Sequence, residues 1–501
     1  MQTEEIKRKK LYDYLSQASQ KAYNGIYLIA NDVLAKSETR GRILECYLKG
    51  VMPGSFSLVK KTIKVIQYYL KNTAWFVLYL LAKVAHLLSG QKYPINESRK
   101  LYALDVYFIV SDILRQKKFE DRYLTGLAEV LDKSGESYVY IPRWFGSWNP
   151  IYLFRAFRIL KKKEYPVLTE FQLLKWSDYG RALVFLITYP FHAWKFIGGL
   201  GDSIEDRLLR FALWETLDTV ILKNYIRYLF GKEVSCLKSS EIKCISWYEN
   251  QASDKAFFRG LRHVSGKIKV FGAQLYVRTE TLLNRHPDES EIRFGVVSDK
   301  VLVNGPGYNL GLKVILEQVG PSLRYGKLFR VKADPARGDI ILILLPYHDH
   351  VSRYVLELIK GVAWPAAVMI KFHHTAEKDK YAAHISSEFS ATDDDLYVLF
   401  GRARLVVGRG TGALVEAACL GIPTIEIAGS AKFSHDFMPE YGKGVLWNKA
   451  FHKEDVRRLM HQFEEALRLD ASALRVMGEK MRDKYFCEPT EEQSIRAFDL
   501  A

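Results

Sequence analysis

The chain has 501 residues, of which 48% are hydrophobic and 26% are charged. This balance is typical of a globular protein of two or three domains, and it excludes a disordered or collagen-like chain. Lys and Arg number 73 and Asp and Glu number 57, so the formal net charge is +16 and an anionic partner is favoured. The five cysteines form no CxxC pair, which argues against a disulfide framework and indicates a reducing compartment.

The first hundred residues (1–100) are predicted to form a helical, basic region. They contain 17 Lys and Arg residues against 7 Asp and Glu residues. No acidic residue occurs between Glu45 and Glu97, where lysines recur among aromatic and aliphatic side chains. A basic amphipathic helix of this kind suits an anionic membrane surface. A helical subdomain with a solvated basic face explains the same pattern.

Two strongly apolar segments, 73–88 and 182–200, could insert in a membrane. Each is interrupted by lysine, and each falls short of the roughly 20 clean apolar residues that a spanning helix needs. The opening MQTEEIKRKK carries charges where the apolar core of a secretory signal would begin. We therefore expect neither a secretory signal nor a regular membrane span.

From residue 101 the pattern changes to strands that alternate with helices. Continuous apolar runs predict buried strands of a parallel sheet. In the first block they lie at 103–112, 137–143, 165–170, 242–251 and 267–274, and 292–296 with 300–304 is predicted as a closing strand pair. We assign this block to one Rossmann-like domain over 101–320, with a helical insertion at 175–235.

A second alternating block follows a linker near 305–338. Its predicted strands lie at 339–347, 366–374, 404–410 and 422–428, with helices at 350–361, 393–402 and 411–420. We assign 338–470 to a second Rossmann-like domain and expect the C-terminal helix, 471–501, to pack back on the first. The predicted fold class is α/β, with two doubly wound domains that face a cleft and an N-terminal helical extension.

Ligands of open parallel sheets bind at the carboxyl ends of the strands, so these ends supply the candidate residues. In the first domain they carry Asp112, Arg143, Glu170, Glu249, Gln251 and Gln274. Glu249 follows Trp247 and Tyr248, whose bulk is expected to desolvate the carboxyl group and raise its pKa toward the range of a catalytic base or acid. Glu170 is the second catalytic candidate and Asp112 the third. Each carboxylate could instead cap a helix.

In the second domain, histidines and a lysine follow predicted strands. The candidates are Tyr347, His348, Lys371, His373 and His374. Lysine and imidazole groups can hydrogen-bond a phosphate and relieve the charge of a departing nucleotide. His348, His350, His373 and His374 could also supply zinc ligands, but no Cys pair accompanies them and adjacent residues rarely both reach one ion. We expect no metal.

The strongest single element is VVGRGTGALVEAACLGIP (406–423). A glycine-rich turn after a strand lets the backbone approach a ligand, and the following helix N-terminus favours an anion. We expect Arg409, Gly410, Thr411 and Gly412 to hold a phosphate and Glu416 to accept hydrogen bonds from ribose hydroxyls. A tight strand–helix turn without a ligand explains the same glycines.

The segments IKFHHT and GRGTGALVEAACLGIP resemble the Lys-Pro-His-Pro-like motif and the glycine-rich turn of GT-B glycosyltransferases. The likeness is to bacterial enzymes of capsule and lipopolysaccharide O-antigen biosynthesis that use CMP-Kdo or CMP-sialic acid. His374 stands where that motif has proline, and the turn is Gly-Thr-Gly rather than Ser-Ser. The resemblance spans roughly 103–450. It implies a metal-independent transferase without a cofactor that moves a sugar, an acidic one from a CMP donor, onto a lipid-linked surface glycan.

The resemblance also implies roles and a location. Lys371, His373 and the 409–412 turn would bind the nucleotide, and the first domain would bind the acceptor. Glu249 or Glu170 would be the base of an inverting reaction, or the acid or nucleophile of a retaining one. The protein would be cytoplasmic and would bind peripherally to the inner face of the bacterial plasma membrane. It would bind no nucleic acid. The alternatives are a nucleotide-sugar 2-epimerase, a polyol-phosphate transferase that uses CDP-glycerol or CDP-ribitol, and an inactive membrane scaffold.

Overall fold

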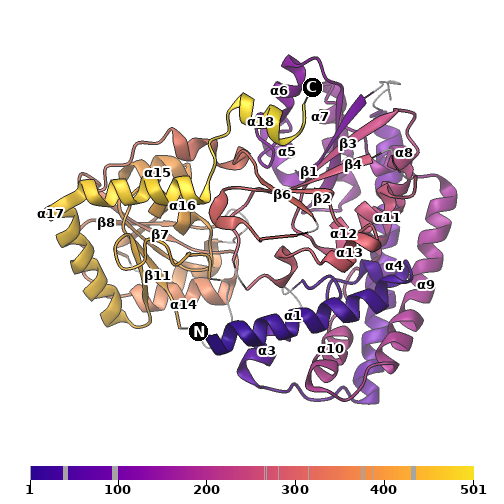
Figure 1. Ribbon diagram of the computed structural model, residues 1–501, viewed down its shortest axis with the longest axis horizontal. Helices are drawn as coiled ribbons and strands as arrows, with labels where there is room; N and C mark the ends of the chain where they lie inside the picture. The colour runs from indigo at the N-terminus through magenta and orange to yellow at the C-terminus, as the bar shows by residue number, and fades with distance from the viewer. Residues whose placement is uncertain are drawn as a thin grey trace.

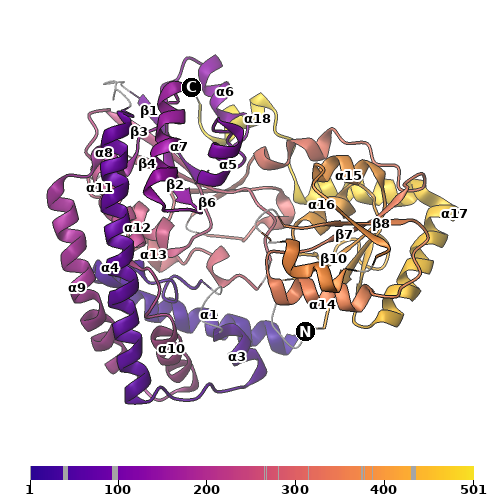
Figure 2. The ribbon, with the colours of Figure 1, turned by 180° about the vertical axis from the view of Figure 1, so that it is seen from behind.

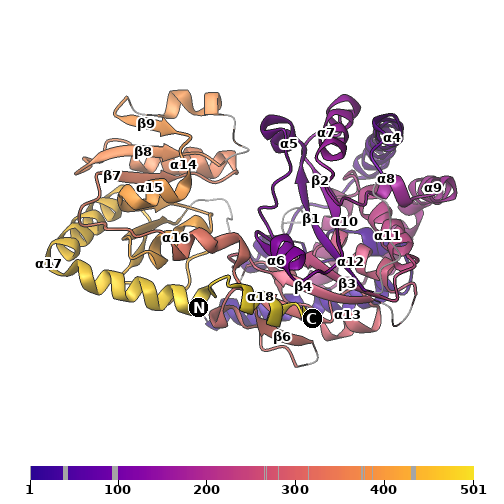
Figure 3. The ribbon, with the colours of Figure 1, turned by 90° about the horizontal axis from the view of Figure 1, so that it is seen from above.

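Two parallel α/β sheets lie side by side in the computed structural model (Figures 1 and 3). The structure describes residues 2–37, 43–92, 100–264, 266, 268–279, 281–313, 315–373, 376, 378–385, 387–429 and 436–500. We call the part built on the first sheet the first domain and the part built on the second sheet the second domain. The two-domain α/β class predicted from the sequence is confirmed.

The first sheet has six strands in the order β2-β1-β3-β4-β5-β6, and every neighbouring pair is parallel. The strands are β1 (Lys100–Ile109), β2 (Tyr138–Phe145), β3 (Glu241–Trp247), β4 (Ile268–Gln274), β5 (Lys300–Val303) and β6 (Leu316–Val319). The four longest are buried along nearly their whole length, as their continuous apolar runs require. The strand order reverses between β1 and β3, which makes their carboxyl ends the switch point of the sheet.

The second sheet has the order β12-β11-β10-β7-β8-β9 and is also parallel throughout. Its strands are β7 (Ile340–Leu344), β8 (Ala367–Lys371), β9 (Phe389–Thr392), β10 (Ala403–Gly408), β11 (Thr424–Ile427) and β12 (Trp447–Ala450). Read from β9, this is the 3-2-1-4-5-6 order of the doubly wound fold. Its switch point lies between the carboxyl ends of β7 and β10.

The N-terminal helices pack directly on the first domain. They are α1 (Gln2–Tyr23), the 3-10 turn η1 (Tyr27–Ala30), α3 (Ile43–Lys49) and the long α4 (Leu58–Ser89). Asn31 donates to the Tyr189 hydroxyl across 2.8 Å, and the buried Lys36 pairs with Glu291 at 3.2 Å. One hydrophobic core runs from Leu11 through the first sheet, so these helices share the core of the domain.

The remaining helices of the first domain cover its sheet. They are α5 (Val110–Gln116), α6 (Leu127–Lys133), α7 (Pro150–Lys162), α8 (Glu170–Leu173), α9 (Trp176–Gly198), α10 (Ile204–Glu215), α11 (Leu222–Ser235), α12 (Ala252–Leu261) and α13 (Glu289–Arg293). Helices α9 and α4 run along the same outer edge (Figures 1 and 2).

The second domain and the chain end complete the fold. Its helices are α14 (Asp349–Ile359), α15 (Leu396–Arg402), α16 (Ala413–Cys419) and α17 (Lys453–Tyr485), and α18 (Glu491–Ala497) follows. Helix α18 lies against α6 on the first domain (Figure 3). There Lys300 donates to the Ala497 carbonyl at 2.8 Å and Lys243 to the Asp499 carbonyl at 2.5 Å. The chain therefore crosses between the domains twice, once through 320–338 and once after α17.

Two predicted strands are wrong. In 165–170 only Val167 bridges to Tyr140, because Pro166 has no amide hydrogen to donate and the Thr169 hydroxyl accepts from Gln172 to start α8. Residues 292–296 form the end of α13 and a turn, because Asp288 and Glu291 make a capping box. Strand β5 pairs instead with β4 and β6.

Candidate functional site

Glu249 lies just beyond the carboxyl end of β3, at the switch point of the first sheet. Trp247 donates its indole N–H to Oε1 at 2.9 Å, and Gln251 donates its amide to Oε2 at 2.6 Å. The carboxylate is half-buried. Burial and the neighbouring charge of Asp254 raise the pKa of Glu249, while the hydrogen bond from Trp247 lowers it. This combination fits a group that exchanges a proton.

The second sheet places aromatic and imidazole groups opposite Glu249. Tyr347 follows β7, is 52% exposed, and stacks on His348 with ring centroids 3.8 Å apart. His373, beyond β8, lies 5.7 Å from the Tyr347 ring. Burial raises the pKa of Tyr347, and the charge of Glu249 raises it further. The residues that follow β3 and β7 therefore face each other across the two domains.

Arg324 lies between carboxylates of the two domains. It comes from the 3-10 segment η4 (Leu323–Phe329), and its guanidinium carbon is 5.6 Å from the Tyr123 ring centroid and 5.8 Å from that of Trp247. Arg324 is exposed by its accessible surface. The protein atoms crowded around its guanidinium would lower its pKa, but Tyr325, Tyr123, Glu416 and Glu249 together raise it. This residue was not predicted, because nothing in the sequence distinguishes it from the other basic residues of a polar linker. We call Glu249, Arg324, Tyr347, His348, His373 and Glu416 the interdomain site.

The glycine-rich turn after β10 is shaped by close approaches. A Cβ on Gly408 would lie 2.6 Å from the Leu344 carbonyl oxygen, and one on Gly412 would lie 2.9 Å from Cβ of Val277 in the first domain. Gly410 has a φ of 62°, which favours glycine. Gly412 is the N-cap of α16, and the Thr411 hydroxyl accepts from the Ala413 N–H at 3.3 Å. The turn is thus one of the places where the second domain touches the first.

Two predicted nucleotide ligands have protein partners. Arg409 is buried, with its guanidinium 5.8 Å from the Tyr354 ring. The Tyr397 hydroxyl donates to Glu416 Oε2 at 2.6 Å. Burial raises the pKa of Glu416, while that hydrogen bond and the charge of Arg324 lower it. Lys371 is half-buried at the end of β8, and His374 lies outside the described residues.

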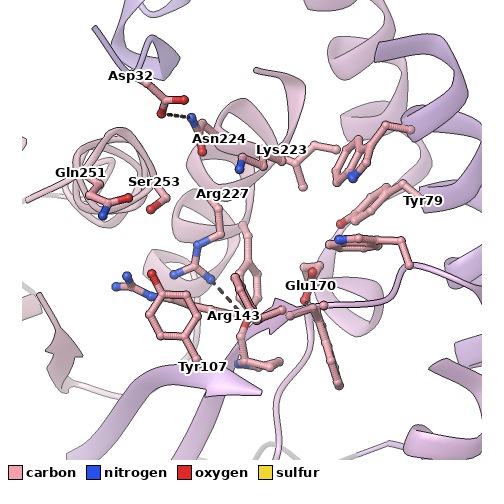
Figure 4. A pocket seen from close by; sticks show the side chains of 18 of the residues that line it. Asp32, Tyr79, Tyr107, Arg143, Glu170, Lys223, Asn224, Arg227, Gln251 and Ser253 are labelled. Atoms are coloured by element: carbon pink, nitrogen blue, oxygen red, sulfur yellow. Dashed lines mark hydrogen bonds between the residues drawn. The ribbon is translucent and has the colours of Figure 1, made fainter. Parts of the chain in front are cut away.

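A second feature is a cavity of about 420 Å³ at the carboxyl ends of β1 and β2 (Figure 4). We call it the aromatic cavity. Its wall includes Trp75 and Tyr79 of α4, Tyr107, Trp144 and Trp148, together with Glu170, Lys223, Arg227 and Gln251. The Tyr79 hydroxyl is buried and has no hydrogen-bond partner among the residues that the structure describes. Gln251 lines this cavity and binds Glu249, so the cavity adjoins the interdomain site.

Glu170 is the titratable group of the aromatic cavity. Trp144 donates its indole N–H to Glu170 Oε2 at 3.1 Å. Burial raises the pKa of Glu170 to about 7, against the smaller opposing effects of its own backbone N–H, Arg227 and Trp144. The carboxyl group can therefore donate or accept a proton near neutral pH.

Arg143 is held in a buried ionic network beneath both features. It donates to Asp105 Oδ1 at 2.9 Å and to Ser246 at 2.7 Å, and it pairs with Asp254 at 2.5 Å. Arg227 also donates to Asp105, at 2.7 Å. Burial would raise the pKa of Asp105, but Arg143 and Arg227 lower it overall. Asp105 was not predicted, although one aspartate inside an apolar strand is an available signal.

Two other predicted residues lie apart from these groups. Asp112 is in the first turn of α5 and pairs with Arg115 at 2.7 Å and Arg122 at 2.9 Å. Gln274 is buried, donates to the Arg285 carbonyl at 3.1 Å and accepts from Arg278. Their polar atoms have protein partners, which suits a structural role. Within the described residues, no three His, Cys, Asp or Glu side chains are grouped to hold a metal ion.

Comparison with known proteins found similar folds only among solved structures. No protein-family model and no curated protein matches the chain. A UDP-N-acetylglucosamine 2-epimerase from Neisseria meningitidis, bound to UDP-GlcNAc, is 12% identical with a TM-score of 0.46, covering 80% of this chain and 100% of its own. The calicheamicin glycosyltransferase CalG4 is 13% identical with a TM-score of 0.41, covering 81% and 97%. Trehalose 6-phosphate synthase from Burkholderia multivorans is 10% identical with a TM-score of 0.42, covering 80% and 96%.

Proposed function

We propose that the protein is a glycosyltransferase that moves a sugar from a nucleotide-sugar onto an acceptor hydroxyl at the interdomain site. One observation carries this proposal: the two doubly wound sheets meet near their switch points, where Arg324 lies 5.8 Å from the Trp247 ring beside Glu249 and the charge of Glu249 reaches Tyr347. Ligands of such sheets bind at switch points. A donor held by the second domain would thus meet an acceptor held by the first.

In the proposed reaction, Glu249 takes the proton of the acceptor hydroxyl. The acceptor oxygen forms a bond to the anomeric carbon, and the bond between that carbon and the donor phosphate breaks. The nucleotide leaves with the electron pair, and Arg324, Lys371 and His373 neutralise its phosphate. This is the inverting form of the reaction. Cationic side chains supply the charge, so the proposal needs no metal and no cofactor.

The donor we propose is an acidic sugar linked to CMP, and the acceptor is a lipid-linked glycan of the bacterial surface. The support for this donor is the resemblance of the IKFHHT and GRGTGALVEAACLGIP segments. The aromatic cavity suits part of the acceptor, because small-molecule pockets of this size combine apolar walls with a few polar groups. In this proposal the protein binds peripherally to the inner face of the plasma membrane and does not bind nucleic acid.

Thermal unfolding with CMP, UDP, GDP and CDP tests the donor. A nucleotide at 100 times its dissociation constant stabilises the folded chain by about 2.7 kcal/mol. We expect CMP to raise the melting temperature most. A shift with UDP alone would refute the CMP donor, and no shift with any nucleotide would refute the transferase.

Product analysis separates the transferase from its alternatives. Incubation with a UDP-N-acetylhexosamine that yields only its epimer would identify a 2-epimerase. Transfer from CDP-glycerol or CDP-ribitol would identify a polyol-phosphate transferase. A protein with no turnover of any donor, whose Glu249→Gln and Glu170→Gln variants act like the parent in cells, would be a scaffold.

A further inference from the structure

The outward faces of α4 and α9 are apolar. On α4, the exposed residues Val77, Leu81, Val84 and Leu88 follow one another at spacings of three or four residues and so share one face of the helix. A helix on the surface of a domain normally turns such a stripe toward the core and polar residues toward water. Helix α4 does bury Trp75 and Tyr79, so it is apolar on both sides.

Helix α9 extends the same surface. The Tyr68 hydroxyl donates to the Leu186 carbonyl at 3.1 Å and the Tyr69 hydroxyl to the Ile187 carbonyl at 2.9 Å, so α4 and α9 pack together. Both form the outer edge of the first domain, away from the second (Figures 1 and 2). We call their exposed apolar residues the interfacial face: Leu58, Val59, Ile63, Ile66, Leu70, Val77, Leu81, Val84, Leu87 and Leu88 of α4, with Trp176, Leu183, Val184, Ile187, Phe191 and Trp194 of α9.

The exposed charges on α4, α7 and α9 are basic, since Asp178 of α9 is buried; Asp218 pairs with Lys64 and Lys71 of α4. Helices α4 and α7, which pack against each other, contain no acidic residue. Exposed cations flank the apolar residues: Lys60 on α4, Arg155, Arg158 and Lys161 on α7, and Lys195 on α9. An apolar surface of this extent marks an interaction site, and cations at its margin fit a partner with an apolar interior and an anionic surface.

We propose that the interfacial face lies on an anionic lipid bilayer, with its apolar side chains at the boundary of headgroups and acyl chains and its cations among the headgroups. No helix within the described residues is long and apolar enough to cross a membrane. The face therefore lies in the plane of the interface, the position of an amphipathic helix with basic flanks. The apolar segment 182–200, which forms most of α9, therefore contacts the bilayer together with α4, although the two are far apart in the sequence.

Docking in this way would bring the aromatic cavity to the membrane. Trp75 and Tyr79 line that cavity from the side of α4 opposite the interfacial face. One helix thus separates the bilayer from the cavity next to Glu249. This link rests on the proposed function, because it makes the bilayer the source of the acceptor; the docking itself does not.

Vesicle flotation of the full chain tests the proposal. The vesicles are phosphatidylcholine alone, and phosphatidylcholine mixed with phosphatidylglycerol. We expect flotation with the mixed vesicles, weaker flotation with the neutral ones, and a decrease on adding salt. The double variants Leu81→Glu/Val84→Glu on α4 and Ile187→Glu/Phe191→Glu on α9 should each lower the partition coefficient about tenfold or more. The matched control, Val398→Glu/Val445→Glu, changes exposed apolar residues of the second domain and should float like the parent.

The proposal would be overturned by variants of both helices that float like the parent, or by a parent chain that floats with neither vesicle. A parent chain that is a dimer without vesicles, and a monomer in the α4 and α9 variants, would show that a second copy covers the face instead. The nucleotide-induced shift in melting temperature is measured on the same proteins. If a variant no longer floats but nucleotide still raises its melting temperature, the variant is folded and only its docking is lost. If the parent chain floats but no nucleotide raises its melting temperature, the proposed function is refuted and the docking is not.

Discussion

Gln251 donates its side-chain amide to Glu249 across 2.6 Å and also lines the aromatic cavity. This contact joins the cavity of the first domain to the site where the two domains meet. Gln251 is the N-cap residue of α12, whose first turn carries Asp254. The position of Glu249 is therefore set by the loop between β3 and α12.

The hydrogen bond from Gln251 stabilises the charged form of Glu249. Gln251→Ala removes it, so the pKa of Glu249 should rise and the acid limb of the pH–rate profile should move to higher pH by about one unit, the effect of a hydrogen bond to a charged group. Trp247→Phe removes the other donor and should act in the same direction. Profiles of kcat/KM for the three proteins measure the shift, and coincident acid limbs would show that Glu249 does not take the proton.

Arg324 supplies positive charge between Glu249 and Glu416. We expect Arg324→Ala to lower kcat/KM about 100-fold or more, the usual cost of removing one group that stabilises developing negative charge. Arg324→Lys keeps the charge but not the planar stacking on Tyr123 and Trp247, and should recover part of the loss. Arg330→Ala, an exposed arginine of the same linker, is the control and should match the parent. Equal kinetics for Arg324→Ala and Arg330→Ala would exclude a role in the reaction.

Glu170 should make the stability of the fold depend on pH. Its pKa is about 7 in the folded chain and near 4.5 unfolded, so the folded state binds the proton more tightly and loses stability as the pH rises between these values. The full effect is about 3 kcal/mol, because one pKa unit corresponds to about 1.4 kcal/mol. Urea unfolding of the parent and of Glu170→Gln, at pH 5 and pH 8, measures it. The parent should lose more stability than the variant over this range, and equal losses would contradict the raised pKa.

Gly412 is the point where the second domain touches Val277 of the first. Gly412→Ala should destabilise this contact by about 1–3 kcal/mol, the cost of overpacking, since the added Cβ would lie 2.9 Å from Val277 Cβ. The φ of Gly412 is −63°, so the backbone itself accepts alanine. Val277→Gly, which removes that Cβ, should recover part of the lost stability in the double variant. A thermal double-mutant cycle with no coupling between the two positions would show that the domains do not meet there.

The two sheets could be predicted because their long strands are continuous apolar runs, such as IILIL in β7. The short strands β6, β9 and β12 have four residues each and mix polar with apolar side chains, so they gave no such signal. The strand predicted at 165–170 failed at Pro166 and Thr169, where a missing donor and a helix cap outweigh the apolar residues.

Glu249 could be singled out in the sequence because an apolar strand and two aromatic residues precede it directly in the chain, and its catalytic role stays a prediction. The aromatic cavity was not predicted, because its walls come from α4, β2, α8 and α11, which only the tertiary fold brings together. Arg324 was missed for the same reason. The residues around Arg324, such as Tyr123 and Glu416, are far apart in the chain, and only the folded structure brings them together.

The central claim is that Glu249 takes a proton from an acceptor bound beside a nucleotide-sugar. Its most direct test is transfer of a labelled sugar by Glu249→Gln, with nucleotide binding measured on the same preparation. We predict that nucleotides raise the melting temperature of the variant as they do that of the parent, while transfer falls at least about 100-fold, the lower end of general base catalysis. A Glu249→Gln protein that transfers sugar at the parent rate would contradict the account.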